Sequence, residues 1–268
     1  MTVKKTKDTD YLFLSSYIHA REARAQDGAA DKEAVFRELS SLAPDKRIVD
    51  FFRLKYDYHN AKVFLKSIAA NADNSRLYSP LSRFAPAVMT EAYRSERYDG
   101  LPAAFGAALR SADDTLARTG DPRLADFILD KAYVQELKET AAAANSAFLS
   151  GYAGLYADAL NLRALVRMLK SGVRAEQLAA VLTDCGTVSV KSIAAAFPDA
   201  AAVLALYRGT ALAALLPEAE RAAKGEGFSA FENACRAALA AYMNKAKYDC
   251  FGERVLIRYL YELEENPA

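Results

Sequence analysis

Residues 57–68 read DYHNAKVFLKSI, and two later stretches repeat their pattern: residues 158–169 read DALNLRALVRML, and residues 249–260 read DCFGERVLIRYL. Each stretch begins with an aspartate, has Asn or Gly at the third following position and has a base at the fifth. The matched polar residues are Asp57, Asn60 and Lys62; Asp158, Asn161 and Arg163; and Asp249, Gly252 and Arg254. Positions seven, eight and eleven after each aspartate are apolar in all three copies.

The spacing of this pattern has a meaning on a helix. With 3.6 residues per turn, positions 0, 3, 7, 8 and 11 share one stripe, whereas position 5 lies off it. We therefore expect the Asp and the Asn or Gly to continue a buried apolar stripe, with the base on its flank. A carboxylate in that place needs hydrogen-bond donors, because an unpaired buried charge is very costly. Backbone amides at a helix start, or the Asn amide, can supply them.

The copies are separated by 101 and 91 residues, which is much longer than the unit of a small helical solenoid. They are predicted to be one equivalent helix in each of three lobes. Two interpretations of the nine polar residues stay open, since they could build the helix packing or contact a partner directly. Our hypothesis is the architectural one.

The rest of the chain also has the sequence character of helices. It is rich in Ala, Leu, Lys and Glu, contains 12 glycines, and shows no lasting alternation of period two. Helices are expected at 9–24, 31–42, 45–70, 82–93, 102–118, 122–169, 174–184 and 189–196, with a last long helical pattern after Gly227. We predict an all-α fold. Its 268 residues suggest several lobes, which we divide at 1–100, 101–200 and 201–268.

Composition excludes several classes of protein. The net charge is +1, and no dense basic stripe with aromatic residues indicates nucleic-acid binding. The basic start, with Lys4, Lys5 and Lys7, is not followed by the apolar core of a signal peptide. The most apolar stretch, residues 194–216, is interrupted by proline and charged residues, whereas a membrane span needs about 20 apolar residues. We expect a cytoplasmic protein that does not cross the bilayer.

Candidate catalytic groups are few. His19 and His59 lack metal-ligand spacing, and His59 is expected to face solvent or make a hydrogen bond. The pair Asp113-Asp114 is similar to the acidic pairs of helical prenyl-transfer enzymes, but it lacks the full motif and a second copy. The segment 225–227 lacks the spacing of a phosphate-binding loop. Cys250 has no histidine placed in sequence to activate it. We predict no catalytic site, cofactor or metal.

Two further groups of residues have simple interpretations. An odd number of cysteines without CxxC spacing favours reduced thiols. Basic residues also recur near the end of one predicted helix, where they form a solvated face or contact acidic loops of a partner. The cysteines are Cys185, Cys235 and Cys250, and the basic residues are Arg163, Arg167, Lys170 and Arg174.

The ordered motifs of this chain resemble those of the C subunits of prokaryotic V-type or A-type ATP synthases, a family related to the d subunits of vacuolar ATPases. The resemblance extends from Tyr11 to Glu264. The matching pieces are Ala20-Arg21, Tyr56-Asp57-x-x-Asn60-x-Lys62, Asp130-Lys131-x-Tyr133, Asp158-x-x-Asn161-Leu162, and Phe251-Gly252-Glu253 with Tyr259.

The chain departs from the family in two places. Residues 25–30 form a short link where the family carries a helical hairpin, so we expect a shortened first lobe. The acidic segment 262–265 should continue into another helix but is followed only by residues 266–268. We expect an incomplete C-terminal helix, unless further segments lie outside this sequence.

The resemblance implies a funnel of three pseudo-equivalent helical lobes with no chemistry of its own. It also implies a location at the cytoplasmic face of the membrane. There the protein links the D and F subunits of the central shaft to the rotor ring of c or K subunits, and it transmits torque for proton or sodium transport. The alternative hypothesis is a free-standing helical adaptor or scaffold.

Overall fold

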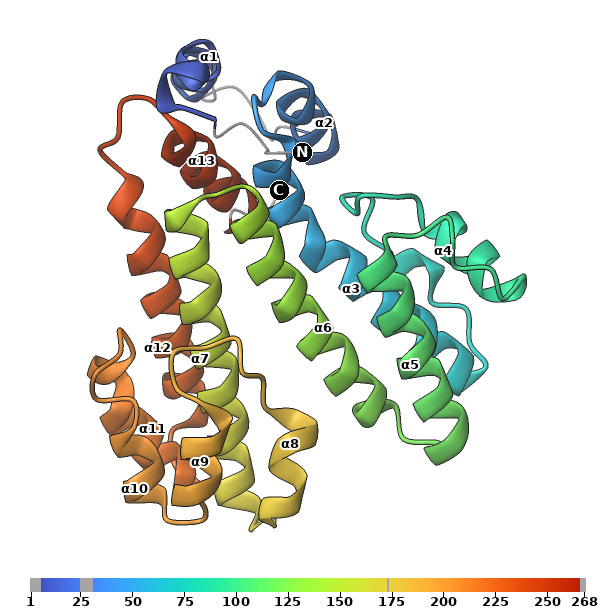
Figure 1. The fold of residues 1–268 in the computed structure, drawn as a ribbon, viewed down its shortest axis with the longest axis vertical. Coiled ribbons are helices and arrows are strands. Elements are labelled where there is room, and N and C mark those ends of the chain that lie inside the picture. The colour runs from blue at the N-terminus through green and yellow to red at the C-terminus, as the bar shows by residue number, and fades with distance from the viewer. Residues whose placement is uncertain (1–5, 25–30, 173, 266–268) are drawn as a thin grey trace. The chain divides into compact units, whose positions relative to one another are not determined.

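The computed structural model describes residues 6–24, 31–172 and 174–265 (Figure 1). Throughout these residues the regular structure is helical and no strand forms, which confirms the all-α prediction. Lys4, Lys5, the link 25–30 and the end 266–268 lie outside the described residues. The expectations of a shortened first lobe and an incomplete C-terminal helix fall on those segments.

The helices follow one another along the chain with short connections. The α-helices are α1 (Leu12–Arg24), α2 (Lys32–Leu42), α3 (Lys46–Ala70), α4 (Pro86–Arg94), α5 (Ala103–Thr119), α6 (Pro122–Ala143), α7 (Ala147–Ser171), α8 (Leu178–Val181), α9 (Val190–Ala196), α10 (Ala200–Ala205), α11 (Leu216–Ala223), α12 (Phe228–Met243) and α13 (Glu253–Glu265). The 3-10 turns are η1 (Asp8–Tyr11), η3 (Ser75–Leu77), η4 (Ala175–Gln177), η5 (Ala213–Leu215) and η6 (Asn244–Ala246).

Side-chain caps explain where several of these helices begin. Asp45 accepts a hydrogen bond from the Arg47 amide at the start of α3, and Asp199 accepts from two amides at the start of α10. Such caps satisfy amides that have no partner inside the helix, and they place a negative charge at the positive end of the helix dipole.

The prediction of a single helix at 122–169 is wrong, because the helix is interrupted between α6 and α7. Asn145 adopts a left-handed conformation with φ of 56°, and the Ser146 amide donates to the Ala141 carbonyl at 3.2 Å. This is the hydrogen-bond pattern that ends a helix, and Asn can take the place that glycine usually occupies. The surrounding run of alanines concealed the break.

Two compact units divide the chain. The first contains residues 1–148 and 243–268, and α3, α5 and α6 pack against one another in it (Figure 1). The C-terminal helix α13 packs on α1 and α3 within the same unit. Its core therefore joins segments from both ends of the chain, including the fully buried Ile18, Leu54, Phe105 and Leu256.

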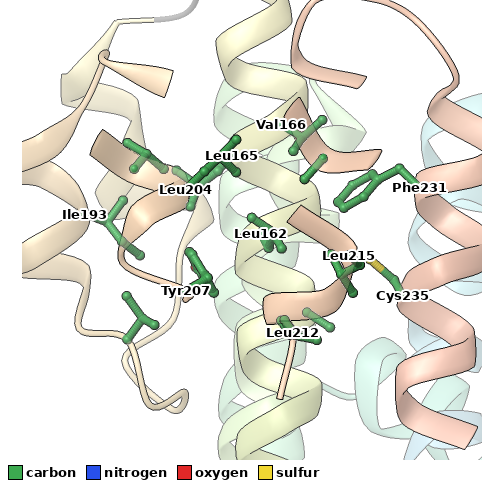
Figure 2. Close-up of a cluster of buried hydrophobic side chains, with 14 of the residues drawn as sticks. Leu162, Leu165, Val166, Ile193, Leu204, Tyr207, Leu212, Leu215, Phe231 and Cys235 are labelled. Atoms are coloured by element: carbon green, nitrogen blue, oxygen red, sulfur yellow. The ribbon is translucent and has the colours of Figure 1, made fainter. Parts of the chain in front are cut away.

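The second unit contains residues 149–242. Its core lies between α7, the short helices α9 to α11, and α12, as Figure 2 shows. Leu162 and Leu165 of α7, Phe231 of α12 and Tyr207 are all fully buried in this core. The division into three lobes at 1–100, 101–200 and 201–268 stays a prediction, as does the funnel. None of the helices in the described residues has the length and the hydropathy that a membrane span requires.

Candidate functional site: two equivalent loop clamps

Asn60 of α3 and Asn161 of α7 each hold the backbone of one later residue. Asn60 Nδ2 donates to the Ser79 carbonyl at 3.0 Å, and Asn60 Oδ1 accepts from the Ser79 amide at 2.8 Å. Asn161 binds the Thr183 carbonyl and amide in the same way, at 2.7 and 2.9 Å. A side-chain amide that pairs with both groups of one residue takes the place of a backbone partner. It fixes the loop to the helix.

The aspartates bind four residues further along each loop. Asp57 Oδ1 accepts from the Arg83 amide at 2.7 Å, and its Oδ2 accepts from Arg83 Nε. Asp158 Oδ1 accepts from the amides of Thr187 and Val188 at 2.9 and 3.2 Å, and its Oδ2 accepts from the Thr187 hydroxyl. Both carboxylates are buried. Each is therefore compensated by donors from its loop, as a buried charge requires.

The two loops have the same internal turn. Ser79 Oγ accepts from the Leu81 amide at 3.3 Å, and Thr183 Oγ1 accepts from the Cys185 amide at 3.3 Å. Leu81 and Cys185 are buried at matching places. After each turn a helix begins, α4 at Pro86 and α9 at Val190. We call residues 57, 60 and 79–85 the first clamp and residues 158, 161 and 183–189 the second clamp.

The first clamp also explains why α4 starts later than predicted. A helix was expected from residue 82, but residues 82–85 belong to the loop that α3 holds. The amide of Arg83, which bonds Asp57, is thus not available to a helix. The helix starts only at Pro86, whose fixed φ suits a first turn.

The basic residues of the first two copies are not part of the clamps and form ion pairs with a neighbouring helix. Lys62 forms an ion pair with Asp130 of α6, and Arg163 forms one with Glu232 of α12. Arg167, one turn later, binds the other oxygen of Glu232 at 2.9 Å. These bases therefore tie α3 to α6 and α7 to α12.

The third copy departs from the predicted pattern. Asp249 lies in the connection before α13, is only half-buried, and pairs with Arg254 of its own copy at 3.0 Å. Gly252 has φ of 103°, a conformation that favours glycine, and its amide donates to Ser15 Oγ at 3.2 Å. The Glu253 amide, at the start of α13, donates to Asp8 Oδ1. The aspartate of this copy therefore does not sit on a helix.

The apolar positions of the repeat follow the predicted stripe closely. Seven of the nine are buried, Leu169 is half-buried, and Ile68 is 39% exposed near the end of α3. The seven are Phe64, Leu65, Leu165, Val166, Leu256, Ile257 and Leu260.

A second buried carboxyl group, which the sequence did not indicate, lies against the first clamp. Arg83 Nη2 pairs with Glu136 Oε1 of α6 at 2.8 Å, and Glu136 Oε2 accepts from the Tyr58 hydroxyl at 2.8 Å. Burial raises the pKa of Asp57 to about 6, Arg83 opposes this rise, and the charge of Glu136 adds to it. Two carboxyl groups thus share one guanidinium.

The other candidate residues take no part in the hydrogen bonds described for the clamps. His59 Nε2 lies 2.9 Å from the Leu77 carbonyl. His19 Nε2 lies 3.1 Å from the Cys250 carbonyl, so the fold brings a histidine to Cys250, but to its backbone. The pair Asp113 and Asp114 lines an open pocket of about 640 Å³ with two tyrosines.

The remaining residues that the sequence offered as candidates are possible metal ligands, the cysteines, the glycine turn and two basic residues. No group of three or more His, Cys, Asp or Glu side chains is placed there to hold a metal. The three cysteines, all within the described residues, are not joined in disulfides; Cys185 and Cys235 are buried and Cys250 is exposed. The turn at 225–227 contains two glycines with positive φ. Lys170 and Arg174 are exposed.

The loop partners were missed because they lie 19 and 22 residues after their Asn. A signal does exist, since residues 79–83 and 183–187 both place a hydroxyl residue first, an apolar residue third and a small residue fourth. Finding it requires an alignment that continues beyond the eleventh position and allows a gap, because the two spacings differ.

Comparison with known families gives a match over most of the chain. The family model described as ATP synthase (C/AC39) subunit matches residues 29–265, a range that contains both clamps and the third copy. No curated protein gives a significant match.

Proposed function

Because the chain belongs to the ATP synthase (C/AC39) subunit family, we propose that it is a non-catalytic coupling subunit of a rotary V-type ATP synthase or ATPase. In this role it links the D and F subunits of the central shaft to the membrane rotor ring and transmits torque for proton or sodium transport. It sits at the cytoplasmic face of the membrane. The match to residues 29–265 is the observation that carries the proposal.

The clamps suit a part that transmits force. A loop held only by solvent-exposed contacts yields easily, whereas a buried and fully paired polar network stiffens the segments that it joins. Each clamp ties a loop to a long helix through a carboxylate and a side-chain amide. We propose that the Asp, Asn and base residues act in this architectural way and do not contact the shaft.

Co-purification tests the coupling role. The tagged chain is co-expressed with the D and F shaft subunits of the same organism, and the product is analysed by size-exclusion chromatography with light scattering. We expect one species that contains all three proteins. From detergent-solubilised membranes, the tag should recover the rotor ring together with an ATP-hydrolysing A/B hexamer.

A monomer that ignores the shaft and the ring would refute this proposal and favour the free-standing adaptor or scaffold. Asn161→Ala separates architecture from contact. If Asn161 is architectural, the variant loses thermal stability, and any loss of shaft binding disappears at a temperature where the variant is folded. Lost binding with unchanged melting would instead identify a contact residue. Glu176→Ala, an exposed change in the same unit, is the matched control.

A further inference from the structure

The two clamps share one backbone design but differ in charge. Asp57 of the first clamp is fully buried and Glu136 of α6, which lies against it, is 8% exposed, so both carboxyl groups are removed from water. Both are bound by Arg83, which carries a single positive charge. With both acids ionised, the cluster has one surplus negative charge in a medium where such charge is costly.

The groups around Asp57 come from three elements. The clamp loop contributes Arg83, α6 contributes Glu136, and α5 contributes Phe105, which cannot ionise and packs on the rings of Tyr58 and Phe84. α3 itself adds Tyr58 beside Asp57, and Arg53 and Asp50 one and two turns before it.

The α3 groups do not remove the surplus. Arg53 donates to the carbonyls of Leu81 and Ser82, and its positive charge is offset by Asp50, a carboxyl group that interacts with both Arg53 and Arg83. Tyr58 donates its hydroxyl to Glu136 and adds no positive charge. Asp50 is a further acid, and burial raises its pKa.

The second clamp is built without this conflict. Thr187 stands where the first clamp has Arg83, and its hydroxyl replaces the guanidinium at Asp158 Oδ2. Asp158 has three donors, and no acid shares them among the residues that the structure describes. The second clamp is thus an internal control for the first.

We propose that the Asp57–Arg83–Glu136 cluster is a proton-binding site that holds the first clamp closed in mildly acidic solution and loosens it when the proton leaves, while the second clamp does not respond. With the proton on Asp57, Arg83 stays paired with Glu136 and no charge is in surplus. When the proton leaves, opening of residues 79–85 brings Asp57 to water and relieves the surplus charge. The closed clamp therefore binds the proton more tightly than the open one.

Two observations support this proposal. The geometry places two buried carboxyl groups on one guanidinium, and the pKa of Asp57 is raised to about 6. The inference concerns this chain alone and does not depend on its partners.

The test is nuclear magnetic resonance of the isotope-labelled full chain between pH 5 and pH 8. We expect the amide proton of Arg83 to shift along a single titration curve with its midpoint near pH 6. Its protection against hydrogen exchange, corrected for the intrinsic pH dependence, should fall about tenfold from pH 5 to pH 8, because aspartate in the open loop regains its ordinary pKa. The Thr187 amide should do neither.

Two variants test the proposal directly. Glu136→Gln removes the competing acid and should move the midpoint to lower pH, and Asp57→Asn should abolish the titration. A flat Arg83 signal from pH 5 to pH 8, or protection that rises with pH, would overturn the proposal. A titration midpoint that does not move in Glu136→Gln would also overturn the proposal. This second variant keeps the test decisive if Asp57→Asn fails to fold.

Discussion

The second clamp allows a quantitative prediction for Asp158→Ala. This change leaves three donors without an acceptor, namely the amide of the buried Val188 and the amide and hydroxyl of Thr187, which is itself exposed. A hydrogen bond to a charged group contributes about 1.5–3 kcal/mol, but losses within one network are not additive, because water and small movements compensate some of them. We expect the free energy of unfolding of the second unit to fall by about 3 kcal/mol.

Urea denaturation followed by circular dichroism measures this loss, and hydrogen exchange with mass spectrometry locates it. Exchange should accelerate first in peptides that cover residues 183–196, because the loop and α9 lose their attachment to α7. Asp158→Asn keeps one acceptor oxygen and should fall between wild type and Asp158→Ala. Glu176→Ala should remain within about 0.5 kcal/mol of wild type. An Asp158→Ala protein as stable as this control would refute the reasoning.

Three further predictions concern glycines, pH and cysteine reactivity. Gly186→Ala would bring its Cβ into collision with Asp158 Oδ1 and should destabilise the fold by about 1–3 kcal/mol. Gly154→Ala lies inside α7 with open space around it and should stabilise the fold by up to about 1 kcal/mol. Thermal melting of both variants measures these changes. Because the pKa of Asp57 is raised in the folded chain, the contribution of this group to stability is complete below about pH 4 and is lost as the pH rises through 6. In urea titrations, the free energy of unfolding of the wild type should therefore fall by about 2–3 kcal/mol over that range relative to Asp57→Asn. A difference between the two proteins that stays constant with pH would contradict the assignment. Iodoacetamide should modify Cys250 in the folded chain but not the two buried cysteines until urea unfolds it, as peptide mass spectrometry would show, and early labelling of a buried thiol would count against the packing described above.

The sequence predicted the helical class and most helix positions because apolar spacing and aspartate caps act over a few residues. It also predicted that Asp57, Asn60, Asp158 and Asn161 lie on helical stripes that are buried. The break at Asn145 was missed because Asn adopts a left-handed conformation only in some contexts, and no neighbouring glycine or proline marked the place.

The partners of the clamps could not be predicted by helical periodicity, since they depend on where the chain returns. Thr183 and Ser79 meet their asparagines through loops of different length, and Glu136 reaches Arg83 from a helix distant in sequence. The third copy misled the alignment for another reason. Gly252 matches by spacing, but its positive φ places Asp249 outside the helix.

The side chains of Asn60 and Asn161 recognise only main-chain groups, and every residue type except proline has both of those groups. The clamps therefore set the path of each loop while placing little demand on most of its side chains. One position can accordingly be Arg83 in one loop and Thr187 in the other, while the amide of each still donates to the matching aspartate. A chain built in this way can diverge in the sequence of its loops while the helices that hold those loops are retained. The loop of one unit can then carry a charge that the loop of the other unit lacks.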